Sequence, residues 1–272
     1  MVRIISSLVG AAFVLALAIA LFGSVSGVLS DPAVPTAVEE FHRAPKDIAF
    51  TSDGMTGKFD LRQVQRGFQV YKEVCSACHS LTHVAFRDLT KIGYSDAEVK
   101  KIAADWSNKQ SVQDPKSGDR TERSNVASDH FPHVYYPGQG NPPDLSLITK
   151  ARHDGPAYVA SLLTGYTDQP AALLKKFPDS KTPDGLYYNP YFANLNIAMP
   201  PPLASEGQVT YTDGTRPTVD QMAKDVAAFL VWTAEPELEQ RHSTGWAVLI
   251  FLLIGTALAY GSYRTIWRNV KH

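Results

Sequence analysis

Uncharged apolar residues form two long runs in this 272-residue chain, and a mixed apolar and polar pattern lies between them. The first run, Ile4 to Phe22, follows Arg3 and precedes the small-residue stretch Ser24–Ser26. A basic residue, an apolar stretch and a small-residue cleavage site are typical of an export signal. We therefore predict a signal peptide over residues 1–26, with an uncleaved membrane anchor as the alternative.

The second run, Gly245 to Tyr263, is long enough to cross the hydrocarbon core of a membrane. Trp246 and Trp267 lie near its two ends, as in interfacial aromatic belts. Basic residues follow the run, namely Arg264, Arg268 and Lys271, and such flanks favour the cytoplasmic side. The pattern predicts a periplasmic domain over residues 27–243, a transmembrane helix over residues 244–263 and a cytoplasmic tail over residues 264–272.

Between the two runs, apolar residues recur with helical spacing in several segments. The predicted helices span Asp60–Val74, Ser95–Trp106, Gly155–Gly165 and Thr218–Ala234. Asp60 is placed to cap the first helix, and Ser95 with Glu98 forms a capping box at the second. Thr218 with Gln221 forms another capping box at the start of the last helix.

Other parts of the domain show no such period. Ser107–Asn141 is polar and is predicted to be a loop, and Asp31–Phe50, with three prolines, is predicted to be an extended lead-in. The 18 glycines and 18 prolines indicate long irregular connections between short helices. About 210 residues remain between the apolar runs, which indicates one sizeable domain.

The candidate chemistry centres on the pentapeptide Cys75-Ser76-Ala77-Cys78-His79. Two thiols at this spacing add to the two vinyl groups of a porphyrin, and the imidazole that follows is held at the iron. A bare CxxC redox pair does not need the histidine, and a zinc site needs more such ligands than the two cysteines of this chain supply. The motif predicts one covalently bound haem c and leaves no cysteine for a disulfide within the chain.

The order of the predicted helices around this motif is typical of the c-type cytochrome fold, whose first and last helices cross beside the haem. Gly67 permits such a close crossing, although a helix also tolerates a glycine without that role, at a cost of about 1 kcal/mol. Trp232 in the last helix packs either on the haem or in the ordinary core. We predict a mainly α protein with a c-type cytochrome fold, long irregular loops and a C-terminal transmembrane helix.

A second axial ligand, opposite His79, is expected to be a methionine or a histidine. Met199 precedes three prolines that stiffen its loop, so its thioether is a candidate, and packing in the core is the alternative. Met222 lies on the core face of a predicted helix, where packing is expected. The remaining candidates are Met55, His83, His130, His133 and His153.

Several further segments make the chain resemble the cytochrome c1 family, the haem subunits of cytochrome bc1 complexes (quinol–cytochrome c reductases). These segments are Arg66–Tyr71, which leads into the CxxCH motif, Pro142–Ser146, Ala151–His153, Tyr158, Ser161–Tyr166, Tyr187–Phe192, Ile197–Pro202 and Ala234–Pro236. The chain departs from many relatives in its short loop at Tyr135–Asn141. It also has no extra cysteine pair of the kind that some bacterial relatives carry.

The resemblance implies a role for each matching residue. Cys75 and Cys78 hold the haem by thioether bonds, and His79 and Met199 are the axial ligands of the iron. The other implied pocket residues are Arg152, which faces a haem propionate, Tyr158, Pro143 and Leu145.

The resemblance also implies partners and a location. The chain accepts electrons from the Rieske iron–sulfur protein and passes them to a cytochrome c, while quinol is oxidised on cytochrome b. It carries electrons within a multi-subunit oxidoreductase and catalyses no reaction by itself. Its implied location is the bacterial inner membrane, with a single span and a periplasmic haem domain. The alternatives are a membrane-anchored c-type cytochrome that serves a different respiratory enzyme, and a non-redox haem sensor.

Charge bears on the electron acceptor. Removing the four positive charges of Arg3, Arg264, Arg268 and Lys271 from the formal net charge of −1 leaves −5 for residues 4–263. An acidic periplasmic face would attract a basic electron carrier. The alternative is that the mild negative charge only keeps the domain soluble. Candidate docking carboxylates are Glu235, Glu237 and Glu239, which stand beside the predicted anchor and fit a stalk equally well. The sequence shows no basic stripe that would favour nucleic-acid binding.

Overall fold

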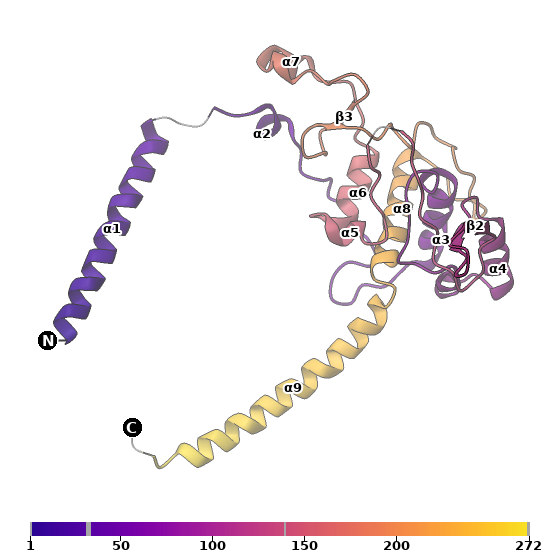
Figure 1. Ribbon diagram of the computed structural model, residues 1–272. Helices are drawn as coiled ribbons and strands as arrows, with labels where there is room; N and C mark the ends of the chain where they lie inside the picture. The colour runs from indigo at the N-terminus through magenta and orange to yellow at the C-terminus, as the bar shows by residue number, and fades with distance from the viewer. Residues whose placement is uncertain (1, 31–33, 139, 271–272) are drawn as a thin grey trace. The chain divides into compact units, whose positions relative to one another are not determined.

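The structure is a computed structural model that describes residues 2–30, 34–138 and 140–270. The chain divides into two units, which we describe separately. The first unit ends at Phe41 and contains helices α1 (Val2–Ser30) and α2 (Ala37–Phe41). The second unit contains the other described elements, which are mainly helices joined by long loops (Figure 1). The predicted mainly α class is therefore confirmed.

In the first unit, α1 is a continuous helix that runs through the predicted cleavage site. It is long and apolar enough to cross a membrane, a property that an export signal near the N-terminus shares. Residues 31–33 of the predicted lead-in lie outside the described residues. The prediction of an extended lead-in is wrong at α2, where Thr36 accepts a hydrogen bond from the backbone of Glu39 and caps a short helix.

In the second unit, the predicted first helix is α3 (Leu61–Val70), continued by a π-helical turn (Tyr71–Cys75). The side chain of Asp60 accepts hydrogen bonds from the backbone of Arg62 and Gln63, which confirms the predicted cap. In the π-turn, the Ser76 N–H donates to the Tyr71 carbonyl over 2.8 Å. The wider turn therefore carries the helix directly into the first cysteine of the motif.

The other predicted helices are also confirmed. They are α4 (Asp96–Asp105), α6 (Gly155–Leu163) and α8 (Val219–Ala234). The capping box of Ser95 and Glu98 is formed. At α8, Thr218 accepts from the Gln221 N–H as predicted, but the Gln221 side chain donates to Asp225 over 2.8 Å. The predicted second capping box is therefore only half formed.

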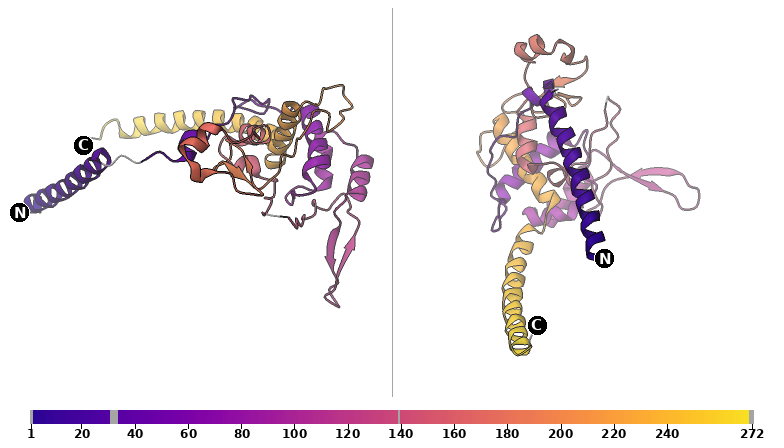
Figure 2. Two further views of the ribbon diagram at one scale, coloured as in Figure 1. Left: turned by 90° about the horizontal axis from the view of Figure 1, so that it is seen from above. Right: turned by 90° about the vertical axis from the view of Figure 1, so that its left-hand side faces the viewer.

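Several short elements were not predicted. They are a 3₁₀ helix (Phe86–Ile92), α5 (Ile148–Ala151), α7 (Ala171–Lys176), a 3₁₀ turn (Pro178–Ser180), and the paired strands β3 (Tyr187–Tyr188) and β4 (Asn196–Ile197). The predicted loop over residues 107–141 is wrong where β1 (Gln110–Gln113) and β2 (Arg120–Arg123) form an antiparallel hairpin. Figure 2 shows this hairpin projecting from the rest of its unit. Its strands are almost wholly exposed, so they carry no apolar alternation from which to predict them.

The helices α3 and α8 cross at Gly67. A Cβ atom on Gly67 would collide with the backbone carbonyl of Asp225 and lie 2.7 Å from the Cβ of Phe229. The close crossing predicted for Gly67 is therefore present, since no larger residue fits between these backbones. Trp232 stacks on Phe229 with ring centroids 5.7 Å apart and is buried.

Aromatic side chains fill the space around this crossing. Phe68 on α3 lies 5.5 Å from Phe229 on α8, and Trp106 lies 4.9 Å from Phe131, measured between ring centroids. Tyr71 contacts both sets, at 5.7 Å from Phe229 and 6.4 Å from Phe131. The last turn before the CxxCH motif is thus anchored in an aromatic cluster of the core, where edge-to-face and offset ring pairs stabilise the fold beyond their area burial.

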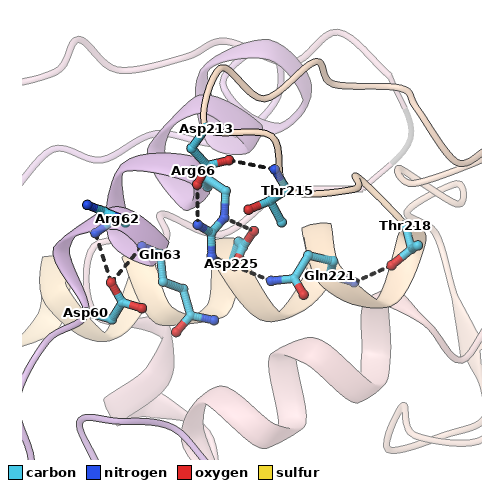
Figure 3. A network of polar contacts seen from close by, with 9 residues as sticks. All are labelled: Asp60, Arg62, Gln63, Arg66, Asp213, Thr215, Thr218, Gln221 and Asp225. Atoms are coloured by element: carbon cyan, nitrogen blue, oxygen red, sulfur yellow. Dashed lines mark hydrogen bonds and ion pairs between the residues drawn. The ribbon is translucent and has the colours of Figure 1, made fainter.

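A partly buried ion-pair network joins the same helices (Figure 3). The guanidinium of Arg66 on α3 makes two hydrogen bonds, of 2.8 and 3.2 Å, to the carboxylate of Asp225 on α8, which is fully buried. It makes a third, of 2.6 Å, to Asp213. Burial alone would lower the pKa of Arg66, but these carboxylates raise it instead, so the network stays charged. Asp213 belongs to the loop that follows Met199, which is therefore tied to α3.

The C-terminal helix α9 (Leu238–Trp267) begins before the predicted span of residues 244–263 and ends after it. It is long and apolar enough to be a candidate membrane span. Its first turns are fixed to the domain, because Glu239 accepts from the Phe59 N–H at 2.9 Å and the His242 ring lies 3.1 Å from the Gly57 carbonyl. The apolar part of α9 therefore continues from a first segment that is hydrogen-bonded to the haem-motif domain.

Candidate haem-binding site

The CxxCH motif folds into one tight turn. The N–H groups of Cys78 and His79 both donate to the carbonyl of Cys75, over 3.1 and 2.9 Å. The hydroxyl of Tyr71 donates to the His79 carbonyl over 2.8 Å. Because Tyr71 is itself packed in the core, this bond fixes the end of the motif to the helix crossing.

Both cysteines are free thiols in partly buried positions. Burial, helped by the neighbouring Cys78, raises the pKa of Cys75 to about 12. A redox-active cysteine pair needs a lowered thiol pKa, because the thiolate is the attacking species. No group of three or more His, Cys, Asp or Glu residues among the described residues is arranged to hold a metal ion. The donor set therefore fits thioether attachment to a haem better than a redox pair or a zinc site.

The imidazole of His79 has a defined tautomer. Its Nδ1 lies 2.8 Å from the main-chain carbonyl of Pro143, which can only accept a hydrogen bond. The proton must therefore be on Nδ1, which leaves the lone pair of Nε2 free for a metal. Burial lowers the pKa of His79, although the Pro143 carbonyl and Asp144 oppose this effect, and the neutral ring is favoured. His79 thus has the chemistry of an axial ligand.

The loop that carries Pro143 is held against the motif by several hydrogen bonds. Leu145 donates its N–H to the Ser80 carbonyl over 2.9 Å. The backbone and the hydroxyl of Thr82 donate to the Asp144 carboxylate over 2.8 and 2.7 Å. Burial would raise the pKa of Asp144, but hydrogen bonds from Ser146 and Thr82 outweigh it and hold the pKa below its ordinary value. Asp144 is therefore ionised, and its hydrogen bonds hold the loop whose Pro143 carbonyl contacts His79.

Met199 lies in the irregular loop after β4 and is partly buried. Its carbonyl accepts a hydrogen bond of 3.1 Å from the Tyr166 hydroxyl. The rival methionines have other surroundings, since Met55 is 64% exposed and Met222 is fully buried in the core of α8, where packing was expected. The rival histidines His83, His130, His133 and His153 are all exposed.

The other predicted pocket residues fall into two groups. Leu145 is buried in the main core, and Tyr158 packs against that core from α6. Arg152 is exposed, and its guanidinium donates to the Ala151 carbonyl over 3.1 Å. Burial raises the pKa of Tyr158, and the nearby Arg152 opposes this rise, so the structure brings these two side chains together.

Two supporting residues were not singled out from the sequence. Asp144 and Tyr166 both lie in segments that carry the family resemblance, but neither spacing nor residue type indicates their contacts. Asp144 bonds to Thr82, which is 62 residues away, and Tyr166 bonds to Met199 across 33 residues. Only the tertiary structure brings these pairs together.

A helix crossing at a glycine, a CxxCH turn behind the first helix and a carbonyl-bound histidine define a c-type cytochrome. The cytochrome C1 family model matches residues 50–270, so the chain belongs to the cytochrome c1 family. It is 42% identical to cytochrome c1 of Rhodospirillum rubrum, over 80% of this chain and 86% of that protein. It is 41% identical to a mitochondrial cytochrome c1 heme protein of Arabidopsis thaliana, over 93% of this chain and 83% of that protein. A protein named cytochrome b/c1, from Bradyrhizobium diazoefficiens, is 41% identical over 79% of this chain and 34% of its own length.

Proposed function

We propose that this chain is the haem-carrying, electron-transfer subunit of a quinol–cytochrome c oxidoreductase, the cytochrome bc1 complex. In this role it accepts electrons from a Rieske iron–sulfur protein and passes them to a cytochrome c. It performs no acid–base catalysis on quinol. The observation that carries the proposal is the hydrogen bond from His79 to the Pro143 carbonyl, directly behind two free thiols, in a member of the cytochrome c1 family.

The proposal assigns the residues that would hold the haem. Cys75 and Cys78 would form the two thioether bonds, His79 would ligate the iron through Nε2, and Met199 would ligate it through its sulfur. When bound, the haem would supply a one-electron ferric–ferrous couple. Met199 donates a neutral thioether, which favours the ferrous state and a high potential. Arg152 would contribute a charge-assisted contact to a propionate, and Tyr158, Pro143 and Leu145 would line the pocket.

The proposed partners in the membrane are cytochrome b and the Rieske protein. The name of the Bradyrhizobium relative, cytochrome b/c1, supports the first, because a cytochrome b and a cytochrome c1 are named together in one protein. This chain matches only 34% of that protein, which leaves room for a second component. The helix α9 offers the corresponding membrane contact in our chain.

We propose a single-span arrangement in the bacterial inner membrane. Residues 1–26 would be a signal peptide, residues 27–243 a periplasmic haem c domain, residues 244–263 the membrane span and residues 264–272 a cytoplasmic tail. The basic residues that follow the proposed span, Arg264, Arg268 and Lys271, support this orientation through the positive-inside rule. Haem attachment outside the cytoplasm requires the same orientation.

We propose that the glutamates near α9 act as a stalk and do not form the surface that meets the cytochrome c acceptor. Glu235 forms ion pairs with Lys150, at 2.6 Å, and with Arg241, at 2.8 Å. Glu237 pairs with Lys91, and Glu239 accepts the Phe59 N–H. Burial raises the pKa of Glu235, but its two cationic partners outweigh this effect and keep the carboxylate ionised. These contacts support the stalk alternative, in which the three residues brace the start of α9.

Co-purification with spectroscopy tests the proposal. The full chain would be expressed in its membrane with a tag at the C-terminus and solubilised gently. A reduced-minus-oxidised spectrum and a quinol–cytochrome c reductase assay would then be recorded. We expect c-type haem together with b-type haem, an iron–sulfur protein and reductase activity. Recovery of c-type haem alone, while control preparations of the complex survive the same detergent, would identify an anchored cytochrome that serves another respiratory enzyme.

A further inference from the structure

The loop around Met199 needs side chains to hold its backbone in place. Pro200, Pro201 and Pro202 have no N–H groups, so they cannot donate main-chain hydrogen bonds. The Tyr166 hydroxyl donates to the Met199 carbonyl over 3.1 Å, and the Gln208 amide donates to the Pro202 carbonyl over 2.8 Å. The bond from Tyr166 is therefore made at the candidate ligand residue itself.

We propose that Tyr166 is a positioning residue for the Met199 thioether. Its hydroxyl holds the Met199 carbonyl and so fixes the direction in which the side chain leaves the loop. This inference rests on the proposed role of Met199 as an axial ligand. Tyr166 itself touches the backbone of the ligand residue and not the iron.

The position of Tyr166 is itself fixed by close packing at the end of α6. A Cβ atom on Gly165 would collide with the ring of Tyr191 and lie 2.8 Å from the side-chain oxygen of Asn189. Asn189 is fully buried, and its amide donates to the Leu162 carbonyl of α6 over 2.8 Å. Because Gly165 has no side chain, Asn189 and Tyr191 can pack directly against the backbone next to Tyr166.

The segment around Asn189 also holds the stretch of chain that precedes Met199. Asn189 donates its N–H to the Leu195 carbonyl over 2.8 Å, and Ile197 of β4 pairs with Tyr187 of β3. The short sheet therefore holds the chain two residues before Met199.

A tyrosine in the same groove provides a matched control. Tyr166, Tyr187, Tyr188 and Pro201 line one hollow of about 410 Å³. Tyr187 is 41% exposed there, and the contact that ties β3 to β4 is made by its backbone. Tyr187→Phe therefore makes the same chemical change as Tyr166→Phe in the same groove, away from the Met199 carbonyl.

The experiment compares wild type, Tyr166→Phe and Tyr187→Phe as full-length proteins carrying covalent haem. Two readouts report the iron–sulfur bond: the far-red charge-transfer band of a thioether-ligated ferric haem, and titration with imidazole as a competing ligand. Phenylalanine keeps the ring, so we expect all three proteins to fold and to retain haem. We expect imidazole to displace the sixth ligand of Tyr166→Phe at about fivefold lower concentration, the effect of losing one neutral hydrogen bond. Tyr187→Phe is expected to titrate like the wild type.

The outcomes separate this inference from the proposed function. If the wild type shows the thioether band but Tyr166→Phe titrates like the wild type, the positioning role is wrong and the ligand assignment stands. If both variants are weakened equally, the effect belongs to the groove in general and the specific role of Tyr166 is overturned. If the wild type lacks the band, Met199 is not the ligand, and the positioning role is overturned with it.

Discussion

His79 and Met199, the two candidate axial ligands, are held in different ways. The ring of His79 is itself hydrogen-bonded, and the loop that supplies its partner is fastened to the motif through Asp144 and Leu145. At Met199, by contrast, Tyr166 donates a hydrogen bond to the main-chain carbonyl, and the three prolines that follow stiffen the loop. The orientation and tautomer of the imidazole are therefore built into the fold, whereas the thioether depends on one loop.

This difference predicts separate consequences for the two sides of the site. Changes on the His79 side act on elements that also hold the core together, so they should lower the free energy of unfolding. Changes on the Met199 side act on a loop that leaves the helix crossing intact, so they should alter the properties of the iron first. The substitutions below test this separation, in order of expected effect.

The largest effect is expected from Met199→His. Replacing a thioether with an imidazole stabilises the ferric state, because imidazole is the stronger electron donor. We expect covalent haem to be retained and the midpoint potential to fall by on the order of 0.2 V, within the roughly 0.8 V that axial ligands span. Redox titration of the purified protein measures this change.

Met222 provides the control for that substitution. It is fully buried in α8, so Met222→Leu changes the core at nearly constant volume and should leave the potential in place. A Met199→His variant with the wild-type potential would show that another residue is the sixth ligand.

On the His79 side, Gly67→Ala should destabilise the fold. An added Cβ collides with the backbone carbonyl of Asp225, and a backbone atom cannot rotate away. Alanine gains about 1 kcal/mol in helix propensity, but forcing the helices apart costs more. We expect a net loss of about 2 kcal/mol in the free energy of unfolding.

Thermal unfolding followed by circular dichroism would measure the effect of Gly67→Ala. Arg62→Ala, on the exposed face of the same helix, is the control and should stay within about 0.5 kcal/mol of the wild type. Equal stability of the two variants would mean that the helices separate freely and that the crossing does not anchor the motif.

Asp144→Asn should have a smaller effect that depends on pH. The folded protein holds the Asp144 pKa below its ordinary value of 3.8, so its carboxylate stabilises the fold above about pH 4. That contribution is lost as the pH falls through the lowered pKa of the folded state. Asparagine accepts fewer hydrogen bonds from Thr82 and Ser146, and we expect a loss of about 1–2 kcal/mol at pH 7.

Urea unfolding at neutral and acidic pH would separate this contribution from general acid effects. We expect the difference in the free energy of unfolding between wild type and Asp144→Asn to shrink toward acidic pH, where the wild-type carboxyl group becomes protonated and is neutral like the asparagine amide. The exposed Asp47→Asn is the control and should follow the wild type at every pH. A difference that stays constant with pH would show that the charge of Asp144 is not what supports the loop.

The parts of the fold that the sequence predicts are those with local signals. Asp60, Ser95 and Thr218 each cap a helix through contacts within three residues, so residue type and spacing reveal them. The short helices α5 and α7 lack a full amphipathic period, and the strands β1 and β2 are nearly all polar. For these elements the hydrophobic pattern contains no information.

The candidate site divides in the same way. The CxxCH motif identifies its own chemistry, and Met199 stands out because of the prolines that follow it. The partner of His79 is 64 residues away, and sequence reasoning reached Pro143 only through a family resemblance, as a pocket wall. The resemblance gave no reason for the contact, which is made by the backbone carbonyl and not by the proline ring. Long-range backbone contacts of this kind depend on the whole fold.

The smallest effect is expected from shortening the β1–β2 hairpin, which lies between the two candidate ligands in sequence. Replacing residues 111–122 with a short glycine linker removes most of the two exposed strands. The change keeps Gln110, which donates to the His130 carbonyl over 2.7 Å, and Arg123, which forms an ion pair with Asp129. We expect the stability to change by no more than about 0.5 kcal/mol and the potential to match the wild type. Thermal unfolding and redox titration measure both. A shifted potential would show that a segment fastened to neither His79 nor Met199 still acts on the iron, and the division of the site into two separately held sides would fail.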